Sequence, residues 1–345
     1  MKLIIGTKFY GHDSSVFIFD NKVFAISEER LTRYKHDRIF PLNAIKKYLE
    51  YSKVKIGDFD EIVLAHSFTD YSKNMILKNI YYLEQIRKKI YNAKYIKEYT
   101  VKHREFGNKN SIGKILYLLS KGNNGLKFLF YRYKNHKDSI TNISKNIVEN
   151  LFGKKVVIKS FDHEKCHAIS SFVSSKFNKA LCITMDGHGD QNIYSSIYLI
   201  DNKFNIRQIA ENKSLYKKAS FIGDKHKYSI ESSLGGIYTY FTFFLGFTPL
   251  ADEGKVEALA AFGKPVIEIY RFLEDNIKVN GIKITINEDT IQKELPLLLE
   301  KYEKEKENLA ATIQKFSEEV ILEYVKNAVK ETGCNNICLS GGGIC

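Results

Sequence analysis

Two histidines and an aspartate that lie close together in the sequence could bind a divalent metal. The stretch from Asp162 to Asp190 is DHEKCHAISSFVSSKFNKALCITMDGHGD. If Asp162 caps a helix, His163 and His167 lie four residues apart on one face, where two imidazoles can hold one ion. Asp186 ends the apolar strand that follows and offers a third, hard ligand. The alternative is a helix with two incidental histidines that leads into a buried strand.

Glycine-rich turns follow two apolar stretches and could admit a nucleotide. Gly187 and Gly189 close the stretch ALCITMDGHGD, and backbone amides can approach an anion at such residues. Ser340, Gly341 and Gly342 follow the stretch NICL in a similar way. The second turn is not followed by a helix in the sequence, so its role stays ambiguous on the residues alone.

Polar and basic side chains near the N-terminus could bind and activate a substrate. His12 lies in the turn GHDSS, and the near-neutral pKa of an unperturbed histidine suits a general base. Arg33 and Lys35 belong to the run EERLTRYKHDRIF, which could collect phosphate oxygens. The alternatives are a surface turn for the first segment and a solvated strand edge for the second.

The composition is that of an ordinary globular protein. The chain has 345 residues, of which 44% are hydrophobic and 27% charged, and its formal net charge is +13. The basic residues are dispersed, with one concentration between Tyr71 and Lys145. We interpret the charge as compositional bias and disfavour a nucleic-acid partner. The sequence shows neither an apolar run long enough to span a membrane nor a signal peptide, and its five cysteines suit reduced thiols. We therefore expect a cytoplasmic protein without a membrane anchor.

The first part of the chain predicts a ribonuclease-H-like lobe. Three hairpin strands are followed by a helix and further strands, a pattern typical of the actin-like superfamily (ASKHA). Residues 70–150 are helical in pattern and rich in lysine and tyrosine, and we interpret them as an insertion on this lobe, which spans residues 1–178. The expected elements are strands at 3–9, 16–20, 23–30, 61–67 and 156–160, and a helix at 41–52.

Residues 179–345 predict a second lobe of the same kind. A strand, a glycine-rich turn and another strand open it, and a group of helices follows. The expected strands are one that enters a glycine-rich turn within 180–190, one at 193–201 and one that enters a glycine turn within 336–343. The expected helices lie at 233–246, 254–263 and 308–332. The fold class is therefore α/β with two actin-like lobes, the second of which we expect to be incomplete.

Several motifs in this order resemble the O-carbamoyltransferase family of nodulation and antibiotic-biosynthesis enzymes, the NodU/CmcH type. They are GHDSS, EERLTRYKHD, the H-x-x-x-H-A-x-S-x-F helix, MDGHGD, SLGGIYTYFTFFLGF, DEGKVEALAAFGKP and LSGGG. Because they run from the first strand to the last residues, the resemblance covers nearly the whole chain.

The resemblance implies a two-lobe actin-like domain joined to a C-terminal YrdC-like domain. The YrdC-like part makes carbamoyl-adenylate from carbamoyl phosphate and ATP, and the actin-like part passes the carbamoyl group to a hydroxyl of a sugar, glycan or natural product. By motif match His12 would be the base, while Lys35 and Arg33 would contact the intermediate. The first glycine turn and Ser340, Gly341 and Gly342 would bind the nucleotide.

The same match implies a divalent metal, with iron(II) favoured, on His163, His167 and Asp186. This sequence departs from the family where Asp162 replaces a usual histidine, and the 70–150 insertion is longer than expected. It also ends inside a motif that continues GG-x-x-x-N in the family, before the YrdC-like domain. We therefore expect this chain to be inactive alone. The alternatives are a tRNA threonylcarbamoyl-transfer-like protein and a non-catalytic remnant.

Overall fold

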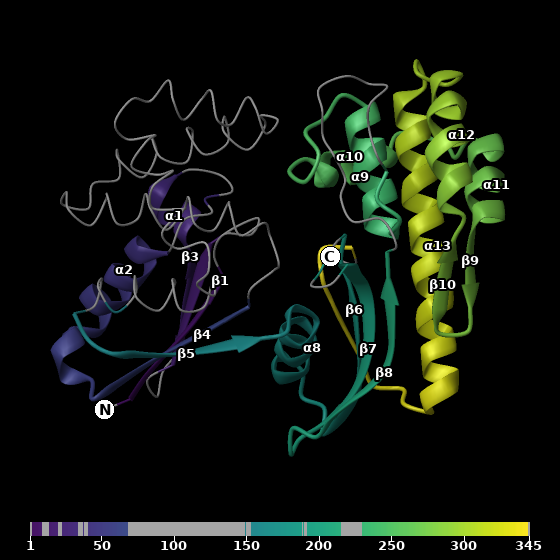
Figure 1. Cartoon of the computed structure of the whole chain (residues 1–345). Coiled ribbons are helices and arrows are strands. Elements are labelled where there is room, and N and C mark those ends of the chain that lie inside the picture. Colours follow the sequence, from purple (N-terminus) through teal and green to yellow (C-terminus); the bar gives the residue numbers. More distant parts are fainter. Residues whose placement is uncertain are drawn as a thin grey trace, which may run out of the picture. The chain divides into compact units, whose positions relative to one another are not determined.

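The chain forms two compact units, Met1–Asp162 and His163–Cys345 (Figure 1). The computed structural model describes residues 2–8, 14–19, 23–33, 37, 41–67, 149, 153–187, 189, 192–214 and 230–343. The predicted insertion at 70–150 lies outside the described residues, apart from Glu149. The division at residue 162 precedes the lobe boundary that we predicted at 178, and it assigns the helix after Asp162 to the second unit.

The first unit is built on a mixed five-stranded sheet in the order β3-β2-β1-β4-β5. The first three strands form the predicted antiparallel meander. Strand β4 runs parallel to β1, and β5 runs parallel to β4. The strands are β1 (Lys2–Lys8), β2 (Ser15–Phe19), β3 (Val23–Ser27), β4 (Glu61–Ser67) and β5 (Val156–Phe161).

One face of this sheet is covered by helix α2 (Leu42–Ser52). Its buried residues include Leu42, Ile45 and Tyr48, whose helical spacing forms an apolar stripe. The stripe packs on alternate residues of the strands, such as Ile5 and Ile18, which are direct partners across the sheet. A short 3₁₀ helix, η1 (Ile56–Asp58), precedes β4.

The second unit holds a four-stranded sheet in the order β11-β6-β7-β8. Strands β6 (Lys179–Met185), β7 (Ile193–Asp201) and β8 (Ile206–Lys213) are antiparallel, and β11 (Ile337–Ser340) runs parallel to β6. Strand β6 is buried on both faces, which accounts for its unbroken apolar sequence. Cys182 faces the helix α8 (His163–Ser174), whereas Ile183 faces the larger core.

The larger core is formed by helices on the opposite face from α8 (Figure 1). The long α13 contacts α9, α10 and α11, and a two-stranded hairpin packs beside it. A buried network also joins α13 to the sheet: Tyr324 Oη accepts hydrogen bonds from Ser195 and Asn212 at 2.8 and 2.9 Å. The elements are α9 (Leu234–Phe244), α10 (Glu253–Ala260), α11 (Ile267–Asn276), β9 (Ile277–Asn280), β10 (Lys283–Ile286), α12 (Glu288–Glu300) and α13 (Lys306–Thr332).

The expected strand over 23–30 is wrong in its second half. Strand β3 ends at Ser27, and a short helix, α1 (Glu28–Thr32), follows it. The chain turns here because the Glu28 side chain is fully buried and reaches the start of α2. Its carboxylate accepts hydrogen bonds from the backbone N–H groups of Asn43 and Ala44 at 3.1 and 2.9 Å. Glu28 thus satisfies amide groups that the first turn of a helix leaves without partners.

Within the described parts of the chain, none of the helices is long and apolar enough to cross a membrane.

We expect Glu28 to make the stability of the first unit fall as pH rises. Burial raises the pKa of this carboxyl from 4.5 to about 7, although the amide hydrogen bonds oppose the shift. Between these values the folded chain keeps a proton that the unfolded chain releases, so stability is fully present below pH 4.5 and is lost as pH rises through 7.

Hydrogen exchange of peptides from β3 and α2, at pH 5 and pH 8, measures this effect. The wild type should lose about 2 kcal/mol of local stability between the two conditions. Glu28→Gln carries a fixed neutral side chain and should lose little. An equal loss of local stability between pH 5 and pH 8 in the two proteins would show that Glu28 does not titrate in this range.

Candidate metal centre

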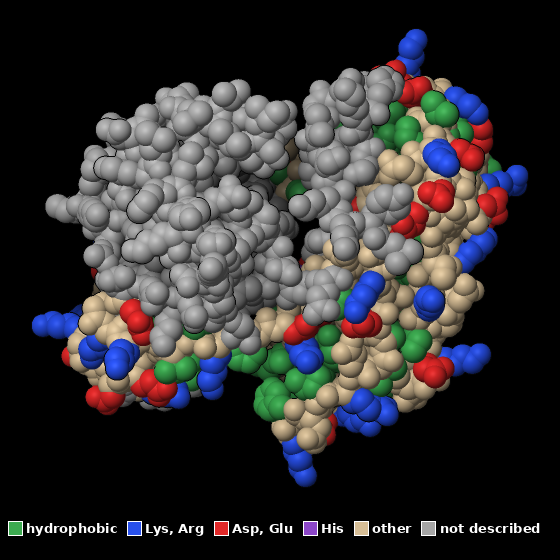
Figure 2. Space-filling view, viewed as in Figure 1, with side chains coloured by type: hydrophobic (Ala, Val, Ile, Leu, Met, Phe, Trp, Pro, Cys, Tyr) green, Lys and Arg blue, Asp and Glu red, His purple; other side chains and the backbone are tan. Residues whose placement is uncertain are grey.

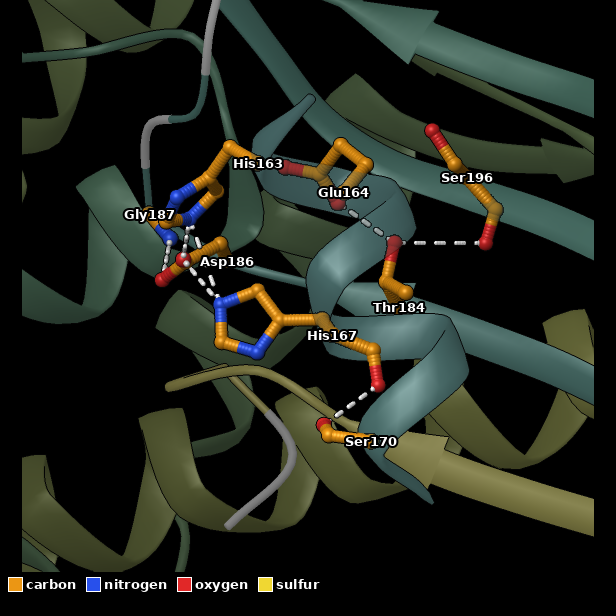
Figure 3. Close-up of polar contacts among 8 residues, drawn as sticks. All are labelled: His163, Glu164, His167, Ser170, Thr184, Asp186, Gly187 and Ser196. Carbon is orange, nitrogen blue, oxygen red and sulfur yellow. Dashed lines mark hydrogen bonds and ion pairs between the residues drawn. The ribbon is translucent and has the colours of Figure 1, made fainter. Parts of the chain in front are cut away.

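The candidate centre lies in the second unit, where α8 meets the carboxyl end of β6. Helix α8 begins at His163, directly after Asp162, and places His163 and His167 on one face. Strand β6 ends at Met185, so Asp186 is the first residue beyond it. Because α8 packs against β6, the helix face and the strand end come together (Figure 3).

Three side-chain atoms form a small triangle at this point. The Nε2 atoms of His163 and His167 lie 2.9 and 3.4 Å from Asp186 Oδ2. The two Nε2 atoms are 3.2 Å apart, and their rings meet edge to face. In the part of the chain that the structure describes, these residues are the group whose ligand atoms converge closely enough to hold a metal ion.

The size of the triangle fits one metal ion. Ligand atoms about 2.1 Å from an ion lie about 3.0 to 3.4 Å apart when they subtend angles of about 90 to 109°. The three observed separations cover the same range. Two neutral imidazoles and one carboxylate on a single face leave the other coordination positions open, a donor set suited to iron(II), zinc or manganese.

The electrostatics of the triangle favour an ionised Asp186. Burial by itself raises the pKa of this carboxyl, but the hydrogen bonds and charges of His163 and His167 outweigh burial and hold the pKa well below its usual range. The other carboxylate oxygen, Oδ1, accepts a hydrogen bond from the Gly187 N–H at 3.0 Å. The carboxylate is therefore fixed at both oxygens.

Glycine turns surround Asp186. A Cβ on Gly341 would lie 2.2 Å from the carbonyl oxygen of Met185, and one on Gly342 would lie 3.2 Å from Asp186 Oδ1. Gly341 also has φ +107°, which side chains rarely adopt. The turn after β11 thus lies against the turn after β6 because it carries no side chains.

The first turn of α9 closes the arrangement from another side. Ser233 caps this helix by accepting the Gly236 N–H, and its hydroxyl donates to the Gly187 carbonyl at 2.8 Å. A Cβ on Gly235 would lie 2.7 Å from Gly187 Cα. The amino end of α9, which carries positive partial charge, therefore lies against the turn next to Asp186.

A second carboxylate lies behind the triangle. Glu164 is fully buried, and its Oε2 accepts a hydrogen bond from Thr184 Oγ1 at 2.5 Å. Burial raises the pKa of Glu164, while the Thr184 hydrogen bond and the charge of His163 act in the opposite direction. Sequence analysis missed Glu164, Thr184 and Ser233. A serine directly before an apolar helix is a capping signal that could have identified the last of these.

The predicted site residues fall into three groups. The predicted metal ligands converge, and Gly187 and Gly342 lie beside them. Gly189 belongs to the turn after β6, and Ser340 is the last residue of β11. The exposed Arg33 lies in the first unit, at the left-handed end of α1. His12 and Lys35 lie outside the described residues, so their roles stay predictions.

The described surface shows how the charged side chains behind the net positive charge are distributed. On the face in Figure 2, the Lys and Arg side chains of the second unit alternate with Asp and Glu side chains. Among the described residues of this unit, Lys301 pairs with Glu268 and Lys255 with Asp252. The described part of this face therefore carries both signs of charge in the same areas.

Comparison with known proteins gives a family and several relatives. The family model described as "Carbamoyltransferase N-terminus" matches residues 3–345. An uncharacterized protein of Methanocaldococcus jannaschii is 34% identical over 365 positions, covering 99% of this chain and 56% of the relative. The nodulation protein NolNO of Sinorhizobium fredii is 24% identical over 350 positions, covering 96% and 40%. The chain spans about half the length of the curated relatives it matches.

Solved structures give weaker likenesses. Component A of (R)-2-hydroxyglutaryl-CoA dehydratase from Acidaminococcus fermentans has a TM-score of 0.39 and 12% identity, covering 99% of this chain and 83% of its own. YeaZ from Pseudomonas aeruginosa has a TM-score of 0.27 and 9% identity, covering 61% and 65%. These structural similarities are too weak to assign a fold family. The α/β class is assigned from the sheets and helices described above.

The contact between α9 and the Gly187 turn can be tested with two matched glycines. Gly235 and Gly254 each occupy the second residue of a helix, but a Cβ on Gly254 would meet nothing within 4 Å. Gly235→Ala should destabilise the second unit by about 1 to 3 kcal/mol through overpacking. Gly254→Ala should be neutral or stabilise by up to about 1 kcal/mol. Urea unfolding of both variants decides the matter, and equal effects would contradict the close approach.

Proposed function

The chain belongs to the carbamoyltransferase N-terminus family, and on that basis we propose that it passes a carbamoyl group from carbamoyl-adenylate to the hydroxyl of an acceptor. The observation that carries the proposal is the triangle of His163, His167 and Asp186, enclosed by glycine turns. The acceptor we propose is a sugar, a glycan or a related natural product. Formation of carbamoyl-adenylate from carbamoyl phosphate and ATP is assigned to a YrdC-like domain, as the sequence resemblance implies.

The triangle would hold a divalent metal, and iron(II) is our first choice. Two imidazoles and a carboxylate on one face are typical ligands of this ion. When bound, the metal would supply positive charge next to the phosphate of the adenylate. His163 is buried, and Asp186 is fixed at both carboxylate oxygens, so the ligand set is held in place by the fold.

The surrounding turns suit the phosphate of a nucleotide. Gly187 has open space where a side chain would be, since nothing among its described neighbours lies within 4 Å of an added Cβ. The amino end of α9 lies against the same turn and favours negative charge. The adenylate would therefore lie with its phosphate between Gly187 and the metal ligands.

The transfer step needs one new bond and one proton acceptor. The acceptor oxygen forms a bond to the carbamoyl carbon, the bond from this carbon to the phosphate oxygen breaks, and AMP leaves with the electron pair. The hydroxyl proton goes to a base, a role that we assign to His12 from its motif. AMP is a good leaving group, so the work of the protein is positioning, charge stabilisation and removal of one proton.

A transfer assay tests the whole proposal. The chain is mixed with ATP, [14C]carbamoyl phosphate and a purified YrdC-like protein that makes carbamoyl-adenylate, together with a panel of amino sugars and polyols. Label should enter an acceptor only when the chain is present, and excess tRNA should not compete. Transfer of label to tRNA in place of the hydroxyl compounds would refute the proposed acceptor class.

Removing a ligand should abolish metal binding. His163→Ala removes one proposed ligand, and Asp186→Asn replaces the charged ligand by a neutral amide. We therefore expect the affinity for Fe2+, measured by anaerobic titration, to fall at least 100-fold in each variant. Ser170→Ala is the matched control, because Ser170 also lies on α8 but its exposed hydroxyl donates a hydrogen bond to the His167 carbonyl and, among the described residues, takes no part in the triangle. Its affinity should stay within twofold of wild type. Unchanged binding in both ligand variants would exclude this site for the metal.

Filling the open space at Gly187 should weaken nucleotide binding without unfolding the chain. A methyl group in Gly187→Ala would meet no described neighbour within 4 Å, so the melting temperature should change by less than about 2 °C. AMP affinity, measured calorimetrically with Fe2+ present, should fall about tenfold because the methyl group occupies the proposed phosphate position. Unaltered AMP affinity would place the phosphate elsewhere.

A further inference from the structure

Glu164 is a charged residue at a buried position, next to the first metal ligand in sequence. Its side chain is fully buried in the contact between α8 and the sheet. Farther along α8 the same contact contains an apolar cluster that includes Ala168, Phe172 and Cys182. Burying a carboxylate costs free energy that an apolar side chain of similar size would not cost. The position therefore calls for an explanation beyond packing.

The hydrogen bond of Glu164 joins the two elements that carry the metal ligands. Its Oε2 accepts from Thr184 Oγ1 at 2.5 Å, as Figure 3 shows. Glu164 lies one residue after His163 on α8, and Thr184 lies two residues before Asp186 at the end of β6. The bond thus crosses from helix to strand directly behind the triangle.

The turn after Asp186 closes against the other side of the same carboxylate. A Cβ on Gly189 would lie 2.2 Å from Glu164 Oε1 and 2.7 Å from the Ile193 carbonyl oxygen. The Gly189 N–H donates to that carbonyl at 2.7 Å, which holds the turn in this position. Gly189 is therefore required locally by its contact with Glu164, an explanation that differs from the nucleotide role predicted for it.

Among the described residues, Glu164 is the acceptor of the shortest hydrogen bond from the Thr184 hydroxyl. Ser196 and Ser340 flank Thr184 on the adjacent strands and share its face of the sheet. The hydroxyls of both serines are buried without a hydrogen-bond partner among the described residues. Among the described residues, Thr184 Oγ1 also lies 3.4 Å from the Ser196 carbonyl oxygen, which is a much weaker contact.

We propose that Glu164 is a positioning residue of the metal centre, whose hydrogen bond to Thr184 sets the spacing between the two imidazoles on α8 and the Asp186 carboxylate. The inference rests on the proposed metal function of the triangle. It concerns the geometry of the apoprotein and requires only that residue 164 accept a hydrogen bond from residue 184. Loss of a residue that hydrogen-bonds directly to a metal ligand typically lowers metal affinity by about 10- to 100-fold. The Glu164–Thr184 bond acts one step farther from the ligands, so we expect an effect at the lower end of this range.

Two mild substitutions in the full chain separate the hydrogen bond from the charge. Thr184→Val keeps the shape of the side chain and removes the donor, so Co2+ affinity should fall about tenfold at constant pH. Glu164→Gln keeps an oxygen that can accept from Thr184, so affinity should stay within threefold of wild type. The visible absorption band of bound Co2+ should shift in Thr184→Val, because the ligand geometry changes, and should stay unchanged in Glu164→Gln.

Tyr324→Phe is the matched control for a purely structural effect. It removes a buried hydroxyl from the opposite face of the same sheet, where Tyr324 bonds to Ser195 and Asn212. Its melting temperature without metal should fall, as for Thr184→Val, but its Co2+ affinity and spectrum should match wild type. Only a positioning role predicts that Thr184→Val changes both stability and the metal spectrum.

The outcomes distinguish this inference from the proposed function. Wild-type protein that fails to bind Co2+ would overturn the metal centre, and the positioning role with it. Normal wild-type binding together with unaltered affinity and spectrum in Thr184→Val would overturn the positioning role alone. A loss in Glu164→Gln without a loss in Thr184→Val would also overturn it, because charge and not the hydrogen bond would then be responsible.

Discussion

The convergence of two imidazoles on one oxygen of Asp186 is the constraint on which the second unit depends. It requires α8 to lie across the end of β6, with His163 and His167 facing the strand. It also requires close approach by Gly342 and by the first turn of α9, because both lie within van der Waals reach of the residues at this strand end. The ligand geometry and the glycine contacts both refer to this one place in the fold.

The sequence predicted the ligand triangle because its determinants are local. Two histidines at helical spacing and an acid at the end of the next apolar strand are enough to bring three ligands together once helix and strand pack. The strands of the meander and the long C-terminal helix were also predicted, within a few residues, from their apolar periodicity. The expected strand through Arg30 failed because Glu28 is buried by a contact with α2 that no local pattern indicates.

Other features depend on contacts whose partners carry no recognisable pattern in the sequence, and these were not predicted. Glu164 and Thr184 are 20 residues apart, and Ser233 and the Gly187 carbonyl are 46 apart. A buried glutamate on a helix looks like a solvated residue until its partner is known. The hairpin of β9 and β10 was also missed, although Asn280-Gly281 between two apolar segments is a turn signal that could have identified it.

The closeness of the ligands along the chain also bears on how the protein folds. His163 and Asp186 are 23 residues apart, whereas β11, which completes the sheet, begins at Ile337. A short loop closes at much lower entropic cost than a long one, so α8 and β6 can meet before the helical core is in place. Binding of the proposed metal to this partly folded chain would favour the correct pairing of helix and strand. In that case the ion would serve as a folding nucleus before it serves any reaction.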